Sequence, residues 1–221
     1  MQLLVTTVIA IAITAIPPLT RLAAGPASPL PAVAAVASLG LVCWMSFSDR
    51  ARHEHPLNLI LLAAFTVAES VVVGAICAQY TLPSVLLAFA ATGVAAGAVS
   101  ASAAHSKTDL TMHGGAMLSA LVAFLCVSVL AAVMRVRFMD GVLAAGGAVL
   151  FAAYLAVDVQ LIFDNSASSS PSAAGGSGAM MMPRRAVTYG PDEYVAASLA
   201  VYLDVVNMLV HLLRLMGERR D

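Results

Sequence analysis

The feature that most constrains the fold is a long apolar stretch near the C-terminal end of the chain that contains a carboxylate. From Tyr194 to Met216 the chain is almost wholly apolar. About 20 helical residues, at about 1.5 Å each, cross the hydrocarbon core of a bilayer, so this stretch predicts a membrane-spanning helix. Asp204 lies near its middle, where a charged side chain costs about 2.5–3.5 kcal/mol on insertion scales. We therefore expect Asp204 to face protein or water rather than lipid.

Three further polar residues share a helix face with Asp204. Asn207, His211 and Arg214 follow it by three, seven and ten residues, and these offsets place all four side chains on one side of a helix. A polar stripe on an otherwise apolar helix should point into a helix bundle or a water-filled path. Asp204 could serve only to hydrogen-bond a neighbouring helix, but the stripe favours a functional role.

The composition indicates a protein that crosses the membrane several times. Of the 221 residues, 61% are hydrophobic and 10% are charged, whereas a soluble domain has roughly 45–50% apolar and 25% charged residues. The net charge of −1 gives no reason to expect nucleic acid as a partner. The three cysteines lie inside apolar runs without metal-ligand spacing, so we interpret them as small core residues.

Six more apolar stretches precede the last one. Together the seven stretches predict seven membrane helices in a single domain, residues 1–221. The first stretch is interrupted by Pro17 and Pro18, but we expect its helix to continue to about Ala24. It resembles the core of a signal peptide in length but has no basic residue before Arg21. The predicted spans are residues 3–24, 31–47, 57–78, 84–104, 116–134, 141–163 and 194–216.

Two other segments carry structural signals. In the fourth predicted span, Gly93, Gly97 and Ala101 repeat at a spacing of four, a pattern of small residues that lets helices approach closely. Residues 165–192 are rich in Ser, Gly, Ala and Pro and cannot bury much apolar surface, so they predict a flexible loop.

Four motifs follow one another in a fixed order along the chain. FTVAES contains Glu69, HSKTDLTMHGG contains Asp109, YLAVDVQLI contains Asp158 and YLDVVNMLVHLLRLMG contains Asp204. They resemble the patterns FTxxEG, TKxDFTxxGG, YxxYDxQxI and LYLDxxNLFxxLLRxxG of the Bax inhibitor-1 family, also called the transmembrane BAX-inhibitor-motif or lifeguard family, which has viral members. Ser70 stands where the family usually has glycine, and Leu110 where it has phenylalanine.

This resemblance implies an all-α integral membrane protein with six helices packed around the C-terminal one. In the family, the aspartates at the positions of Asp158 and Asp204 form a pH-sensitive pair that closes a calcium-permeable pore. The implied function is a pH-sensitive calcium leak channel that modulates calcium stores and cell death. For a eukaryotic or viral member, the resemblance implies the endoplasmic reticulum or Golgi membrane. It implies lipid, calcium ions and other membrane proteins as partners, and no cofactor besides Ca²⁺ as the permeant ion.

Three acidic residues lie at membrane depth, and two of them form the candidate site. The predicted span bounds place Asp158 and Asp204 at depths that differ by roughly 6 Å, a mismatch that helix tilt or different bounds could close. Two carboxylates in a low-dielectric site cannot easily both ionise, so they would share a proton. Both are also candidate transient ligands for Ca²⁺, which prefers oxygen. The supporting polar residues are Glu69, Asn207, His211 and Arg214.

Two alternatives stay open at this point. The aspartate pair could only hold the sixth and seventh helices together. The chain could also be a non-conducting regulatory or interaction protein of the same fold, acting on apoptosis or on host membrane proteins. An intramembrane enzyme is not supported, because the sequence has no HExxH or GxSxG motif and neither aspartate lies in a GxGD motif.

Overall fold

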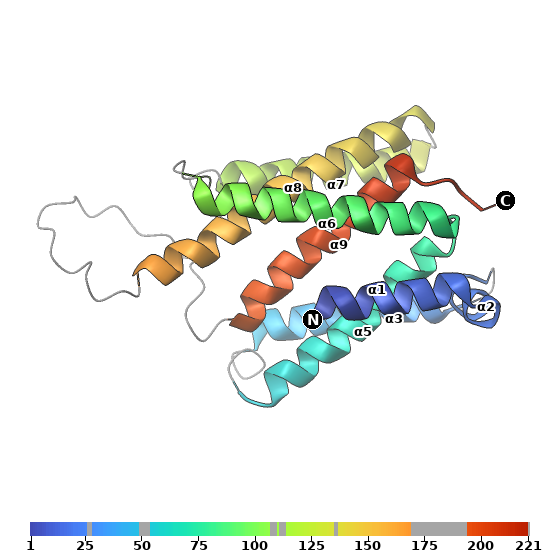
Figure 1. Cartoon of the computed structure of the whole chain (residues 1–221), viewed down its shortest axis with the longest axis horizontal. Coiled ribbons are helices and arrows are strands. Elements are labelled where there is room, and N and C mark those ends of the chain that lie inside the picture. Colours follow the sequence, from blue (N-terminus) through green and yellow to red (C-terminus); the bar gives the residue numbers. More distant parts are fainter. Residues whose placement is uncertain are drawn as a thin grey trace, which may run out of the picture.

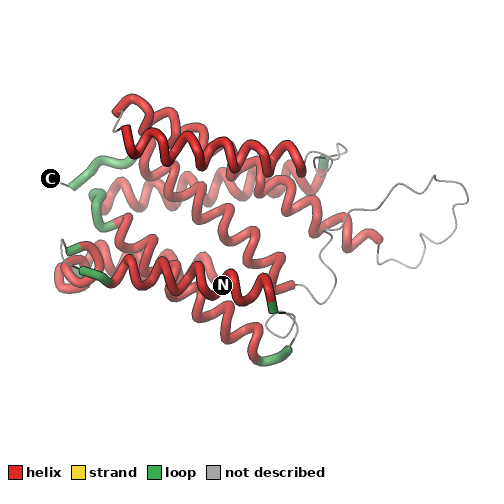
Figure 2. The backbone as a smooth tube through the Cα atoms, turned by 180° about the vertical axis from the view of Figure 1, so that it is seen from behind, coloured by secondary structure: helices red, strands yellow, loops and turns green. Residues whose placement is uncertain are grey.

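The computed structural model describes residues 1–25, 28–48, 54–106, 110, 114–134, 137–168 and 194–220. Within these ranges the regular structure is helical throughout (Figure 2), and two residues, Tyr80 and Arg219, form an isolated antiparallel bridge. The helices of the described part are α1 (Gln2–Ala15), α2 (Pro17–Ala24), α3 (Leu30–Phe47), α5 (Leu57–Cys77), α6 (Leu82–His105), α7 (Gly114–Met134), α8 (Arg137–Ser168) and α9 (Tyr194–Met216).

Six of these helices are long and apolar enough to cross a membrane, namely α3, α5, α6, α7, α8 and α9. They correspond to the second to seventh predicted spans. The pair α1 and α2 would make a seventh span if the two helices were counted together. The prediction of an all-α protein that crosses the membrane several times is confirmed.

The first predicted span differs from the structure, because it is broken rather than continuous. The axes of α1 and α2 enclose an angle of 105°, and Ile16 between them has an extended backbone (φ −103°, ψ 109°). A residue that precedes proline avoids the helical region, and Pro18 has no N–H to donate to a preceding turn. With 14 residues, α1 is about 21 Å long, shorter than the hydrocarbon core of about 30 Å.

Helix α9 runs through the middle of the bundle. It packs against α8, α6, α5 and α1, while α3 lies outside against α5 and α7 lies outside against α8 (Figure 1). In the most apolar 18-residue stretch of α9, 56% of the residues are buried. The corresponding share is 39% for α5 and 6% for α7. The prediction that the last span is the most enclosed by protein is therefore confirmed, and the outer helices expose many apolar side chains.

Two details of the helices differ from the sequence-based expectation. Helix α8 continues to Ser168, four residues into the segment that the composition predicts as loop, and residues 169–193 of that segment lie outside the described residues. The predicted close packing at Gly93 and Gly97 is wrong, since a Cβ placed at either glycine would meet no described atom within 4 Å. Gly93 instead lines a pocket with residues of α1 and α9, at more than contact distance.

Candidate functional site

Helices α8 and α9 bring the two predicted aspartates together. The carboxyl groups of Asp158 and Asp204 lie within hydrogen-bonding reach of each other, and Asp204 is 7% exposed. Asp158 lies ten residues before the end of α8 at Ser168, and Asp204 lies ten residues after the start of α9 at Tyr194. The contact between the two carboxyl groups itself places them at one depth, which closes the predicted mismatch.

The arrangement of the pair requires a proton. A carboxylate is only an acceptor, so a hydrogen bond between two carboxyl groups forms only when one of them is protonated. The second oxygen of Asp204, Oδ2, is buried and has no hydrogen-bond partner. A pair that shares one proton in a low-dielectric setting responds to the loss of that proton, because two like charges at this distance repel strongly.

The surface where α8 meets α9, which we call the α8–α9 seam, holds further polar atoms without partners. Tyr154 lies one turn before Asp158, near both carboxyl groups, and its hydroxyl is buried. Among the described residues, the buried side-chain polar atoms without a hydrogen bond are Tyr154 Oη, Asp204 Oδ2 and His211 Nδ1. Buried polar atoms in native proteins almost always have partners, and those that lack one often mark a functional site or a bound water.

His211 lies in an aromatic setting on the same seam. Its ring stacks on Phe151 of α8 with centroids 5.6 Å apart and meets the edge of Phe124 of α7 at 5.4 Å. A Cβ at Gly147 of α8 would come within 2.4 Å of the His211 ring, so the missing side chain of this glycine provides the space for the ring. The seam is therefore made of Gly147, Phe151, Tyr154, Asp158, Asp204 and His211.

His211 faces α8 as Asp204 does, because its ring stacks on Phe151. Its contribution to pH sensing stays a prediction. Sequence reasoning missed Gly147, Phe124 and Phe151. A glycine doublet, Gly146-Gly147, inside an apolar span is the one sequence signal that could have indicated a close approach in α8.

The structure does not bring the other supporting residues to the aspartate pair. Asn207 donates a hydrogen bond to the Leu203 carbonyl of its own helix at 2.8 Å. Arg214 is exposed near the end of α9. Glu69 lies on α5 within hydrogen-bonding reach of Ser38 of α3. The predicted polar stripe of α9 is thus divided, with Asp204 and His211 alone on the seam.

On its other side, α9 joins a set of hydroxyl groups that sequence reasoning did not find. The Tyr202 hydroxyl hydrogen-bonds Thr6 of α1 at 2.7 Å, and Ser70 of α5 donates to the same Thr6 oxygen at 3.0 Å. Tyr202 also packs edge-on against Phe65 with ring centroids 5.9 Å apart. We call Thr6, Ser70 and Tyr202 the hydroxyl network. Serine and threonine are so common in membrane helices that no sequence signal sets these residues apart.

Fold and site together define a class of protein, namely a multi-pass membrane protein, helical over its described residues, with a carboxyl pair between α8 and α9 of which Asp204 is buried and Asp158 half-buried. Over residues 1–221 the chain matches the family described as Inhibitor of apoptosis-promoting Bax1 (Bax1-I), and it belongs to that family. The predicted resemblance to the Bax inhibitor-1 or lifeguard family is thereby confirmed.

Individual relatives agree with this assignment. Over 82% of its length the chain is 31% identical to protein lifeguard 4 of Mus musculus. It is 28% identical over 81% of its length to the Golgi anti-apoptotic protein of Vaccinia virus (strain Lister), and 28% identical over 76% of its length to protein lifeguard 3 of Homo sapiens. The matched regions cover 66%, 65% and 49% of these three proteins, slightly less than two thirds in the first two cases.

Proposed function

We propose that this chain is an anti-apoptotic membrane protein that lets calcium leak across the bilayer under the control of the Asp158–Asp204 pair. Membership of a family described by inhibition of an apoptosis-promoting protein supports the first part. It also favours a regulatory over an enzymatic role. The observation that carries the second part is the contact between two carboxyl groups, the buried Asp204 and the half-buried Asp158, between two membrane-spanning helices.

The proposed mechanism follows from the charge of the pair. With one shared proton, the two carboxyl groups attract each other and hold α8 against α9. When the pH rises and the proton leaves, two like charges remain in a low-dielectric setting, where their repulsion amounts to several kcal/mol. The repulsion separates the helices, and the carboxylate oxygens then offer a transient binding site to a hard cation such as Ca²⁺.

The proposed location is an intracellular membrane. A viral relative is named a Golgi anti-apoptotic protein, and we extend that location to this chain as part of the proposal. A leak in such a membrane would lower the calcium content of the compartment, which links the transport activity to the control of cell death.

Calcium efflux from liposomes containing the purified protein tests the gating mechanism. We expect the parent protein to leak more calcium as the pH rises from about 6 to about 8, as the shared proton is lost. Asp158→Asn and Asp204→Asn each leave a single carboxylate without a like-charged partner, so both should flatten this pH response. Glu69→Gln is the matched control, because it removes a membrane-depth carboxylate on α5 that does not contact the pair, and it should keep the pH response.

Two results would contradict the proposal in different ways. If both aspartate variants keep the pH profile of the parent, the pair only holds α8 and α9 together. If the parent passes no calcium at any pH while the liposomes are otherwise intact, the chain is a non-conducting regulatory protein of this family.

A further inference from the structure

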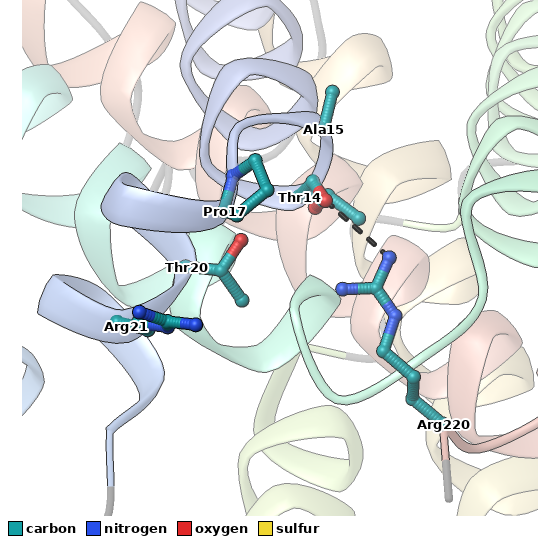
Figure 3. Close-up of a pocket in the computed structure, with 6 residues that line it drawn as sticks. All are labelled: Thr14, Ala15, Pro17, Thr20, Arg21 and Arg220. Carbon is teal, nitrogen blue, oxygen red and sulfur yellow. Dashed lines mark hydrogen bonds between the residues drawn. The ribbon is translucent and has the colours of Figure 1, made fainter.

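A cavity of about 380 Å³ lies where the bend between α1 and α2 meets the tail after α9. Figure 3 shows the guanidinium groups of Arg21 and Arg220 entering it from opposite sides, with Thr20 between them. Arg21 belongs to α2, whereas Arg220 lies about two hundred residues later in the chain. The lining residues are Thr14, Ala15, Pro17, Thr20, Arg21 and Arg220.

The two positive charges on this cavity are not neutralised by the described residues around them. The Arg220 guanidinium donates a hydrogen bond to the Thr14 carbonyl at 3.4 Å, which leaves most of its five N–H groups available. In the described ranges, no acidic side chain forms an ion pair with Arg21 or Arg220. Two guanidinium groups that face one space repel each other, and an anion between them would turn this repulsion into attraction.

The two backbone segments that carry the exposed arginines are held in place. The Arg220 backbone N–H donates to the Gln79 carbonyl at 2.9 Å, and the Thr81 N–H donates to the Glu218 carbonyl at 2.9 Å. These bonds attach the tail to the turn between α5 and α6. On the opposite side, the Thr20 hydroxyl donates to the Ile13 carbonyl at 2.6 Å and fixes α2 against α1. A site organised in advance loses less entropy when a ligand binds.

The cavity lies at the level where the bilayer headgroups are expected. Helices α1, α5 and α9 all end beside it, at Ala15, Cys77 and Met216. The 105° bend turns α2 away from the direction of α1, so that α2 would lie along the bilayer surface if α1 crosses the bilayer. Leu19 and Leu22 of α2 are 36% and 60% exposed, as expected for a helix that lies in the interface with apolar side chains toward the acyl chains.

We propose that this cavity binds the phosphate group of an anionic phospholipid, with Arg21 and Arg220 as its two ligands. Guanidinium groups bind phosphate oxygens through paired, charge-assisted hydrogen bonds. The lipid is favoured over a free phosphate ion because the exposed leucines of α2 place the acyl chains beside the same site. This proposal does not depend on the calcium leak or on the aspartate pair.

Native mass spectrometry of the full chain in uncharged detergent tests the site. The protein is offered equal amounts of phosphatidic acid and phosphatidylcholine, with and without inorganic phosphate. We expect one phosphatidic acid molecule to be retained in clear preference to phosphatidylcholine. Arg21→Gln and Arg220→Gln should each reduce this retention several-fold. Arg219→Gln is the matched control, because it removes the same charge from the same tail but does not line the cavity, and it should retain the lipid.

Three outcomes would overturn the proposal. Equal loss of lipid in the Arg219 and Arg220 variants would indicate a general surface-charge effect. Equal retention of the two lipids by the parent would exclude recognition of an anionic headgroup. If inorganic phosphate displaces the lipid and stabilises the protein as much as the lipid does, the site takes free phosphate instead.

Thermal unfolding with added phosphatidic acid gives a second readout. The lipid should raise the melting temperature of the parent and of the Arg219 variant, but not that of the Arg21 or Arg220 variants. If Arg21→Gln does not fold, Arg220→Gln decides the question, because its side chain belongs to the tail and not to the α1–α2 bend.

Discussion

The two sides of α9 differ in whether their buried polar groups have hydrogen-bond partners. Toward α1 and α5, the hydroxyl network satisfies its own hydrogen bonds, with contacts of 2.7 and 3.0 Å around Thr6. Toward α8, three residues leave a buried polar atom without a partner, namely Tyr154, Asp204 and His211. The first arrangement is what a stable helix contact needs, whereas the second costs stability and is retained where a site has to change its state.

This difference indicates which helix contact is fixed and which one can open. We expect α9 to stay attached to α1 and α5 through the hydroxyl network, while α8 can move away from it along the α8–α9 seam. Substitutions on the two sides should therefore have different consequences for stability and for pH response.

The largest effect on stability is expected at Gly147, where the seam is tightest. In Gly147→Ala the added Cβ would lie about 2.4 Å from the His211 ring, and overpacking of this kind costs about 1–3 kcal/mol. Thermal unfolding in lipid or detergent would show a lower melting temperature. Gly146→Ala is the matched control, because a Cβ there meets only Phe124 at 4.0 Å, an ordinary contact. Equal melting temperatures for the two variants would show that the seam is looser than the structure indicates.

A smaller effect on stability is expected from removing single tyrosine hydroxyls. The effect should differ between the two sides of α9. Tyr202→Phe removes a hydroxyl that bonds Thr6 at 2.7 Å, and a hydrogen bond of this kind contributes about 1 kcal/mol. Tyr154→Phe removes a hydroxyl without a partner, so it should leave the stability unchanged or slightly higher. The comparison fails if Tyr154→Phe destabilises the protein as much as Tyr202→Phe does in the same unfolding assay.

The smallest effect is expected from His211→Gln on the pH response of calcium leak. The His211 ring packs against Phe124 and Phe151, and a charge is costly in such an apolar setting. Its replacement should therefore leave the pH midpoint of the leak almost unmoved. Asn207→Ala is a suitable control, because Asn207 bonds only its own helix backbone at Leu203 among its described contacts. A clear shift of the midpoint in the His211 variant alone would show instead that His211 carries charge near the pair.

Much of the fold and the centre of the site could be predicted from the sequence, because their signals are local. The length and apolarity of Tyr194–Met216 predict a spanning helix, and Asp204 within it predicts that protein encloses it. The motif around Asp158 identifies the partner carboxylate. Six of the seven predicted spans agree with helices of the structure, since hydropathy decides them with little help from tertiary contacts.

The remaining features depend on tertiary contacts that local patterns do not determine. The position of Glu69 beside Ser38 depends on which helix packs against that side of α5. Helix periodicity indicates only that Glu69 faces some neighbouring helix. The fit of His211 against Gly147 depends on the register between α8 and α9, which local patterns do not determine. The sequence predicts the end of that span near Phe163, whereas α8 ends at Ser168. The break at Ile16 has a visible cause in Pro17 and Pro18, but the overall length of the apolar stretch favoured a continuous span.

The position of Asp204, ten residues into the spanning helix α9, has an electrical consequence. Ten helical residues correspond to about 15 Å, or about half of a hydrocarbon core of about 30 Å. A proton that reaches the pair from one side of the membrane therefore crosses about half of the transmembrane voltage. Moving one elementary charge through the whole field involves about 2.3 kcal/mol per 100 mV, so half of it involves about 1.1 kcal/mol. The protonation of this pair should consequently depend on membrane potential as well as on pH.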